Sequence, residues 1–195
     1  NVRAHGNIAR FLVARMLYAD GLATVFAFGG IFAAGTFGME LEQVLLFGIV
    51  LNITAGLGAA AFGWIDDWIG AKPTILISVA GLLLTAGGAV SAPTATWFWI
   101  WGSALGIFVG PAQAASRSMM ARLSPAPLRT EFFGLFALTG KATAFAGPAL
   151  VAWLTVVTDS QRWGLSVILA FFLVGGILIL TVREPAADST DSTAY

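Results

Sequence analysis

The sequence contains no cysteine, and His5 is its only histidine among 195 residues. The lack of cysteine excludes disulfide scaffolds, thiolate metal sites and cysteine nucleophiles. A serine hydrolase needs a base beside its nucleophile, and one histidine outside the apolar runs does not supply it. Within those runs Asp20 is the only acid, whereas an intramembrane aspartyl protease needs two. We therefore expect no enzymatic activity, no metal site and no cofactor.

Charge is the second property that the sequence has little of. Only 10% of the residues are charged, against about 25% in a typical soluble domain, so a water-facing surface cannot be built from this composition. The ten Lys and Arg balance the ten Asp and Glu without a basic block, which excludes nucleic acid as a partner. Most of the chain must therefore face a lipid bilayer.

Long apolar runs account for most of the rest, since 58% of the residues are hydrophobic and the mean hydropathy is +0.86. We predict an all-α, polytopic membrane bundle of six helices over residues 12–183, with a cytoplasmic lead-in at 1–11 and a disordered tail at 184–195. Because the chain starts with Asn1 and its first run is too long for a cleavable signal, we expect a fragment. The predicted spans are 12–37, 43–65, 73–91, 94–116, 132–157 and 163–182.

Basic residues indicate the orientation of these spans, because cytoplasmic loops carry an excess of Lys and Arg. Eight flank one side and only Arg162 flanks the other. The eight are Arg3, Arg10, Arg15, Lys72, Arg117, Arg122, Arg129 and Arg183. We expect both termini in the cytoplasm, with Arg117, Arg122 and Arg129 as topology anchors. Tryptophans near both ends fit interfacial belts: Trp64 and Trp68 inside, and Trp97, Trp99, Trp101, Trp153 and Trp163 outside.

Small residues predict how the helices pack. Gly102, Gly106 and Gly110 are spaced by four, so they line one stripe of the fourth span and let another backbone approach closely. Pro111 and Pro148, each preceded by glycine, are expected to loosen the backbone and permit kinks. These features predict a packed bundle and say nothing about a substrate.

The loop after the second span, residues 63–72, matches the pattern G-x-x-x-D-x-x-G-x-K. We call Gly63, Asp67, Gly70 and Lys72 the signature loop, because the chain here resembles the major facilitator superfamily, whose loop of this kind joins the second and third helices of each six-helix half. We expect Gly63 to permit close helix packing, Gly70 a tight turn, Asp67 to cap a helix N-terminus and Lys72 to stay at the cytoplasmic surface.

A narrower resemblance lies in residues 14–39, 110–125 and 131–148. They look like the C-terminal half of the vacuole-effluxer-like branch of that superfamily, which includes the autophagy-related amino-acid effluxer of fungal vacuoles and many bacterial relatives. The resemblance implies a twelve-span parent, an N-terminal six-helix half as partner, and alternating access with the signature loop as hinge and latch. It also implies amino acids as substrate class, and a plasma, inner or vacuolar membrane according to the organism.

Two charges lie at membrane depth. Lys141 is ten residues past Glu131, about 15 Å along a helix, which is near the middle of a hydrocarbon core of roughly 30 Å. Asp20 is at a comparable depth in the first span. An isolated charge there costs about 2.5 to 3.5 kcal/mol, so we hypothesise that the two face each other. Either the pair lines the transport cavity, with Asp20 as a proton carrier in symport or antiport, or it is a static ion pair.

Other polar residues have two open interpretations. Asn52 can offer a hydrogen bond to a substrate or form an interhelical hydrogen bond. Thr24 can likewise offer a hydrogen bond to a substrate, or it can bond back to its own helix. Gln113 can reach a cavity mouth or make a structural contact, and Tyr18 fits packing. The sequence thus favours a secondary active transporter of a small solute. The alternative is a self-associating six-helix protein with a channel-like or structural role.

Overall fold

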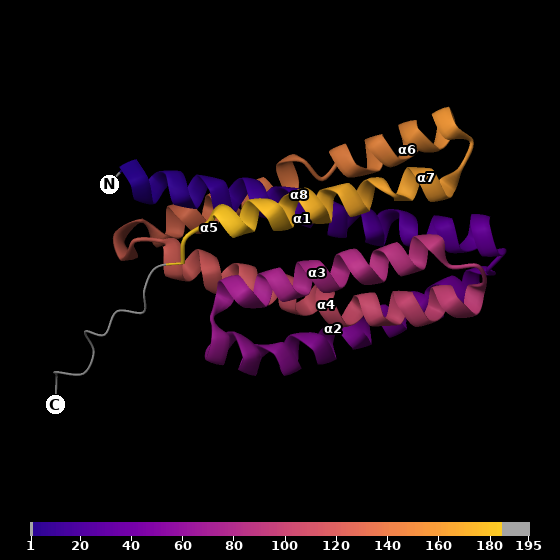
Figure 1. The fold of residues 1–195 in the computed structure, drawn as a ribbon, viewed down its shortest axis with the longest axis horizontal. Helices are drawn as coiled ribbons and strands as arrows, with labels where there is room; N and C mark the ends of the chain where they lie inside the picture. The colour runs from indigo at the N-terminus through magenta and orange to yellow at the C-terminus, as the bar shows by residue number, and fades with distance from the viewer. Residues whose placement is uncertain (1, 185–195) are drawn as a thin grey trace.

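The computed structural model describes the backbone of residues 2–184 and the side chains of residues 6–184. Every element in that part of the chain is a helix, and the long helices run side by side along one axis (Figure 1), which confirms the all-α class. The predicted disordered tail lies outside the described residues from position 185 onward. The helices are α1 Val2–Phe37, α2 Leu41–Ile69, α3 Ala71–Ser91, α4 Ala95–Leu123, the short 3-10 turn Ala126–Leu128, α5 Arg129–Ala142, α6 Ala146–Thr158, α7 Gln161–Leu165 and α8 Val167–Thr181.

Five stretches are long and apolar enough to cross a membrane, and each overlaps one predicted span. They are Gly6–Phe37, Leu41–Ile69, Ala71–Ser91, Ala126–Thr158 and Gln161–Thr181. The remaining predicted span, residues 94–116, lies in α4, which has 29 residues but falls short in apolar content. Tryptophan, glycine and Gln113 lower its hydropathy. α4 tolerates this because it packs against both α2 and α3, so much of its surface meets protein.

The predicted glycine stripe on α4 forms the contact with α2. A Cβ at Gly106 would lie 2.7 Å from the backbone oxygen of Leu51, a distance that real side chains do not adopt. A Cβ at Gly58 of α2 would likewise collide with the backbone oxygen of Ile107 in α4, so close approach is required from both sides. The α2 residues that the stripe meets are Phe47, Leu51, Thr54, Ala55 and Ala59. The prediction that Gly102, Gly106 and Gly110 permit close packing is confirmed.

The predicted fifth span is broken in the middle. α5 ends at Ala142, three residues form a turn, and α6 begins at Ala146. Pro148 lies in the first turn of α6, where its missing N–H removes no intrahelical hydrogen bond. The predicted loosening at Pro148 is therefore seen as a helix break, whereas α4 continues through Pro111.

Two cations fasten α3 to neighbouring segments at opposite ends of the bundle, one to the end of α8 and the other to α7. At one end, Nζ of Lys72 at the start of α3 donates to the carbonyls of Leu180 and Val182, at 2.9 and 2.6 Å. At the other end, Arg162 in α7 donates to the carbonyls of Val90 and Ala92, at 2.6 and 2.8 Å, at the end of α3. The last carbonyls of a helix lack intrahelical partners, so these cations satisfy acceptors that would otherwise be left unpaired.

Candidate functional site

The helix break places a backbone amide against the carboxylate of Asp20. Gly147, in the first turn of α6, donates its N–H to Oδ2 of Asp20 at 3.0 Å. A Cβ at Gly147 would collide with Oγ1 of Thr24 and would lie 3.1 Å from Oδ1 of Asp20, so only glycine allows this approach. The N-terminal end of a helix favours a negative charge, which makes the position suitable for a carboxylate.

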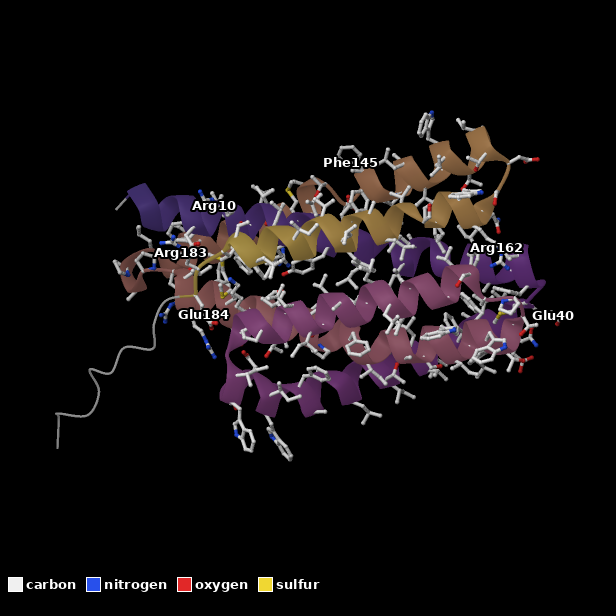
Figure 2. All side chains as sticks on the ribbon, viewed as in Figure 1. Arg10, Glu40, Phe145, Arg162, Arg183 and Glu184 are labelled. Carbon is white, nitrogen blue, oxygen red and sulfur yellow. The ribbon has the colours of Figure 1, made fainter. Side chains whose placement is uncertain are left out.

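Asp20 is buried at membrane depth. It lies 14 residues after Gly6 and 17 before Phe37, the ends of its candidate span, or about 21 and 26 Å at 1.5 Å per residue. The residue is 4% exposed, and its Oδ1 has no hydrogen-bond partner in the described structure. Figure 2 shows Phe145, which lies in the helix break, about midway between the ends marked by Arg183 and Arg162. The carboxylate thus combines one firm hydrogen bond with one oxygen that is free to accept another.

The predicted ion pair between Asp20 and Lys141 is wrong. No salt bridge joins them in the described structure, and the Lys141 side chain is exposed. The prediction counted along one continuous helix, but α5 ends one residue after Lys141 and the chain changes direction there. The residue that meets Asp20 is six positions later, and the partner is a backbone amide instead of a cation.

Thr24 and Asn52 both use their side chains within their own helices. Oγ1 of Thr24 donates to the carbonyl of Asp20 at 2.7 Å, and Thr24 is fully buried against Gly147. Nδ2 of Asn52 donates to the carbonyl of Gly48 at 2.8 Å from an exposed face of α2. For Thr24 the structure agrees with the self-bonding alternative. Asn52 does not make the predicted interhelical bond in the described structure.

Gln113 lies in a polar pocket between α1, α4 and α5. The pocket has a volume of about 220 Å³, and Arg15, Tyr18, Ser116 and Gly140 also line it. The hydroxyls of Tyr18 and Ser116 are hydrogen-bonded at 2.6 Å, and Tyr18 is 1% exposed, so its predicted packing role is confirmed. Gln113 therefore lies on a cavity wall, as one of its two interpretations proposed.

Arg15, which the sequence indicates only as one of the cytoplasmic cations, is a further functional candidate. Its Nη1 donates to the carbonyl of Phe136 at 2.9 Å, and its guanidinium lies 3.5 Å from the centre of the Phe136 ring. A Cβ at Gly140 would lie 2.8 Å from the same nitrogen. The available signal was its position inside an apolar run, five residues before Asp20, where a charge usually marks a functional path.

The signature loop belongs to a charged cluster at the end of the bundle where α1 begins and α8 ends. Glu184 follows α8 and accepts hydrogen bonds from the amides of Ala71 and Lys72, at 3.1 and 3.4 Å, which caps the N-terminus of α3. Arg122 near the end of α4 binds Glu184 at 2.8 Å and lies 3.7 Å from the buried carboxylate of Asp66. The cluster thus connects α2, α3, α4 and the segment after α8. Figure 2 labels Glu184 and Arg183 at this end.

The individual predictions for the signature loop have different outcomes. Gly70 has φ 92°, which L side chains rarely adopt, so the predicted tight turn is confirmed. The cap predicted for Asp67 is wrong, because Asp67 is exposed and Glu184 caps α3 instead. Close packing at Gly63 is also wrong within the described chain, where a Cβ would meet open space. Lys72 reaches the end of α8 rather than only the surface.

A bundle with five candidate membrane spans, a buried carboxylate at a helix break and a charged cluster at one end defines an integral, multi-pass membrane protein. The model of the family described as vacuole effluxer Atg22 like matches residues 1–190, and the chain belongs to this family. The resemblance inferred from the sequence is thereby confirmed.

Three relatives illustrate the similarity. The chain is 24% identical over 190 residues, 97% of its length and 44% of the relative's, to a Bacillus subtilis protein named uncharacterized MFS-type transporter YxiO. It is 26% identical over 187 residues, 86% of the chain and 32% of the relative, to autophagy-related protein 22 of Cryptococcus neoformans. The protein of that name in Coccidioides immitis is 27% identical over 164 residues, 76% of the chain and 27% of the relative. The chain therefore spans less than half the length of these relatives.

Proposed function

We propose that this chain is the C-terminal six-helix half of a secondary active transporter that moves a small solute by alternating access. Membership of the vacuole effluxer family and the MFS-type name of a relative support transport. The share of the relatives that the chain covers, at most 44% in the comparisons above, supports a half with a missing partner. We count α4 as the sixth span because it packs between two candidate spans and is as long as α2.

The observation that carries the proposal is the geometry of Asp20. A carboxylate at the middle of a span is expensive unless it serves a pathway or a pairing, and Asp20 has no cationic partner in the described structure. It lies against a broken helix, and transporters place their binding sites at broken helices near the midplane. The unpaired Oδ1 can hold a proton or accept a hydrogen bond. In this account Asp20 carries the coupling proton, and movement of α6 away from α1 exposes it.

The charged cluster of Asp66, Arg122, Glu184 and Lys72 is the latch in this account. Its contacts hold α3 and α4 against the segment after α8. When the half-bundle rocks, these contacts must either break or move with it as a unit. We place it in the cytoplasm with both termini, because the excess of Lys and Arg lies at this end. The solute class that we propose first is amino acids, because the resemblance to the vacuole-effluxer-like branch implies that class.

Counterflow in proteoliposomes that contain the full-length protein tests transport directly. Labelled amino acids are added outside vesicles preloaded with each unlabelled candidate, without any ion gradient. We expect saturable accumulation for one class of solute. Ion conductance in a voltage clamp without saturation by any solute would instead favour the channel-like alternative and contradict alternating access.

A further inference from the structure

Three cations line two adjoining pockets on the face formed by α1, α4 and α5. The first pocket, of about 220 Å³, contains Arg15 and Gln113. The second, of about 400 Å³, contains Arg15, Arg117 and Lys141 and shares Gly140 with the first. Arg15 therefore stands between the two, where its stacking on Phe136 and one hydrogen bond fix its guanidinium plane.

No acid neutralises these charges within the part of the chain that the structure describes. No aspartate or glutamate lines either pocket, and the only ion pairs found there involve Arg122. Arg117 and Lys141 are both exposed and make no hydrogen bond in the described residues. Asp20 is on another face of α1, where it faces Gly147 of α6.

A face with three unpaired cations does not lie against hydrocarbon. Each charge at the centre of a span costs about 2.5 to 3.5 kcal/mol on insertion scales, and such residues face a bundle interior or a water-filled cavity. Lys141 is 15 residues into the candidate span Ala126–Thr158, about 22 Å along the chain of helical residues. In the proposed transporter, the space between the two halves is an aqueous cavity of this kind, and it would accommodate such a face.

We propose that the two pockets form one subsite that binds the carboxylate of a net anionic solute, such as an acidic amino acid or a small dicarboxylate. Arg15 and Arg117 supply donors in the fork geometry that matches a carboxylate, and Lys141 adds a point charge. Gln113 and the aromatic wall of Phe133 and Phe136 contact the remainder of the solute. This inference rests on the proposed function, because it names the solute class for that transport path.

An anionic lipid headgroup carries similar chemistry, but the depth of Lys141 favours a solute. The headgroup of a lipid stays at the membrane surface, whereas Lys141 is the second-last residue of α5 and lies 15 residues into the candidate span Ala126–Thr158. The site is also polar on more than one wall, with Gln113 from α4 and Arg15 from α1. A soluble anion can reach both walls through an aqueous cavity.

The test measures binding, by isothermal titration, to the full-length protein in phosphatidylcholine nanodiscs. The probes are L-glutamate, succinate, L-leucine and L-lysine. We expect glutamate and succinate to bind at least about ten-fold tighter than leucine or lysine. Arg117→Gln and Lys141→Gln should each weaken glutamate binding about ten-fold. The matched control is Arg129→Gln, which removes an exposed charge outside both pockets and should change nothing.

Three results would overturn the inference. They are equal binding of leucine or lysine, glutamate binding that the two variants leave unchanged, and failure of both anionic probes to bind. Repeating the titration with phosphatidylglycerol in the nanodisc separates the two sources of the anion. If the pockets bind a solute, the affinity for glutamate is the same with and without phosphatidylglycerol. If phosphatidylglycerol weakens glutamate binding to the wild type but not to the variants, the pockets bind a lipid headgroup.

The outcomes also separate this inference from the proposed function. If leucine shows counterflow that Arg117→Gln and Lys141→Gln leave unchanged, the result would support the transport function and contradict the anionic subsite. Anion binding that the variants weaken, without counterflow of any solute, would keep the subsite and remove transport.

Discussion

Asp20 of α1 and Gly147 of α6 are joined by a hydrogen bond of 3.0 Å between a carboxylate oxygen and a backbone amide, across 127 positions of the sequence. The bond exists because α6 starts in the middle of a span and therefore presents an amide that no preceding turn uses. It couples a charge at membrane depth to the one place where the fifth predicted span is already broken. Any change in the protonation or partners of Asp20 thus acts directly on the contact between α1 and α6.

Gly147→Ala tests how tightly this contact is packed. The added methyl group would collide with Thr24 and lie close to Asp20. We therefore expect the free energy of unfolding to fall by about 1 to 3 kcal/mol, with a lower Tm in detergent. Thr24→Ala in the same protein removes the nearest obstacle and should restore part of the loss. Gly134→Ala on α5 is the control, because its Cβ meets open space. Equal Tm values for the Gly147 and Gly134 variants would contradict the contact.

Glu184→Ala tests the charged cluster. The substitution removes the acceptor of two α3 amides and the ion-pair partner of Arg122. We therefore expect the free energy of unfolding to fall by about 0.5 to 2 kcal/mol, measured by thermal unfolding. Asp67→Ala removes an acid of the signature loop that caps nothing in this structure and should leave Tm nearly unchanged. A larger fall in Tm for the Asp67 variant than for the Glu184 variant would show that Asp67, and not Glu184, caps α3.

Lys72→Gln and Arg162→Gln test the two cations that fasten α3 to the end of α8 and to α7, respectively. Each substitution removes a pair of charge-assisted hydrogen bonds to carbonyls at a helix end. We therefore expect each to lower the free energy of unfolding by about 1 kcal/mol or more. The effects should add, because the residues are at opposite ends of the bundle. Lys141→Gln, which removes an exposed cation without a hydrogen bond, serves as the control in the same thermal unfolding assay.

Gly106→Ala tests the stripe between α4 and α2. The new Cβ would meet Oγ1 of Thr54 and the Leu51 carbonyl, so the helices must separate and the protein should unfold at a lower temperature. Gly48→Ala on α2 provides the comparison, because nothing lies within 4 Å of its Cβ. In a helix Gly48→Ala should even stabilise slightly. Identical responses at the two positions would argue against close α2–α4 packing.

The sequence predicted well what depends on periodicity and composition. Spacing by four put Gly102, Gly106 and Gly110 on one stripe, and the contacts with α2 follow from that spacing alone. Apolar runs located the five candidate spans, since length and hydropathy determine what crosses a bilayer. Residues 94–116 of α4 were also predicted to span, but α4 is less apolar than the five because it packs against α2 and α3, and its polar and glycine content reflects protein contacts.

The partners of charged residues were harder to predict, because they depend on geometry between distant segments. Lys141 was expected to face Asp20, but α5 ends one residue after it, and no local pattern shows that α6 restarts with an amide that reaches Asp20 of α1. Glu184 replaced Asp67 as the cap of α3 because α8 returns to the start of α3, a contact over 113 positions. Arg15 was assigned to topology alone, although its place inside an apolar run was a visible signal.

Asp20→Asn in the full-length protein tests the central claim most directly. The amide keeps an oxygen that can accept the Gly147 hydrogen bond, so the fold and equilibrium counterflow should persist, but the side chain can no longer gain and lose a proton. The measurement is uptake of the counterflow substrate into proteoliposomes with and without a pH gradient. We predict that the gradient accelerates uptake by wild type and has no effect on the variant. Uptake that the gradient drives equally well in the variant would contradict the role of Asp20 as the proton carrier.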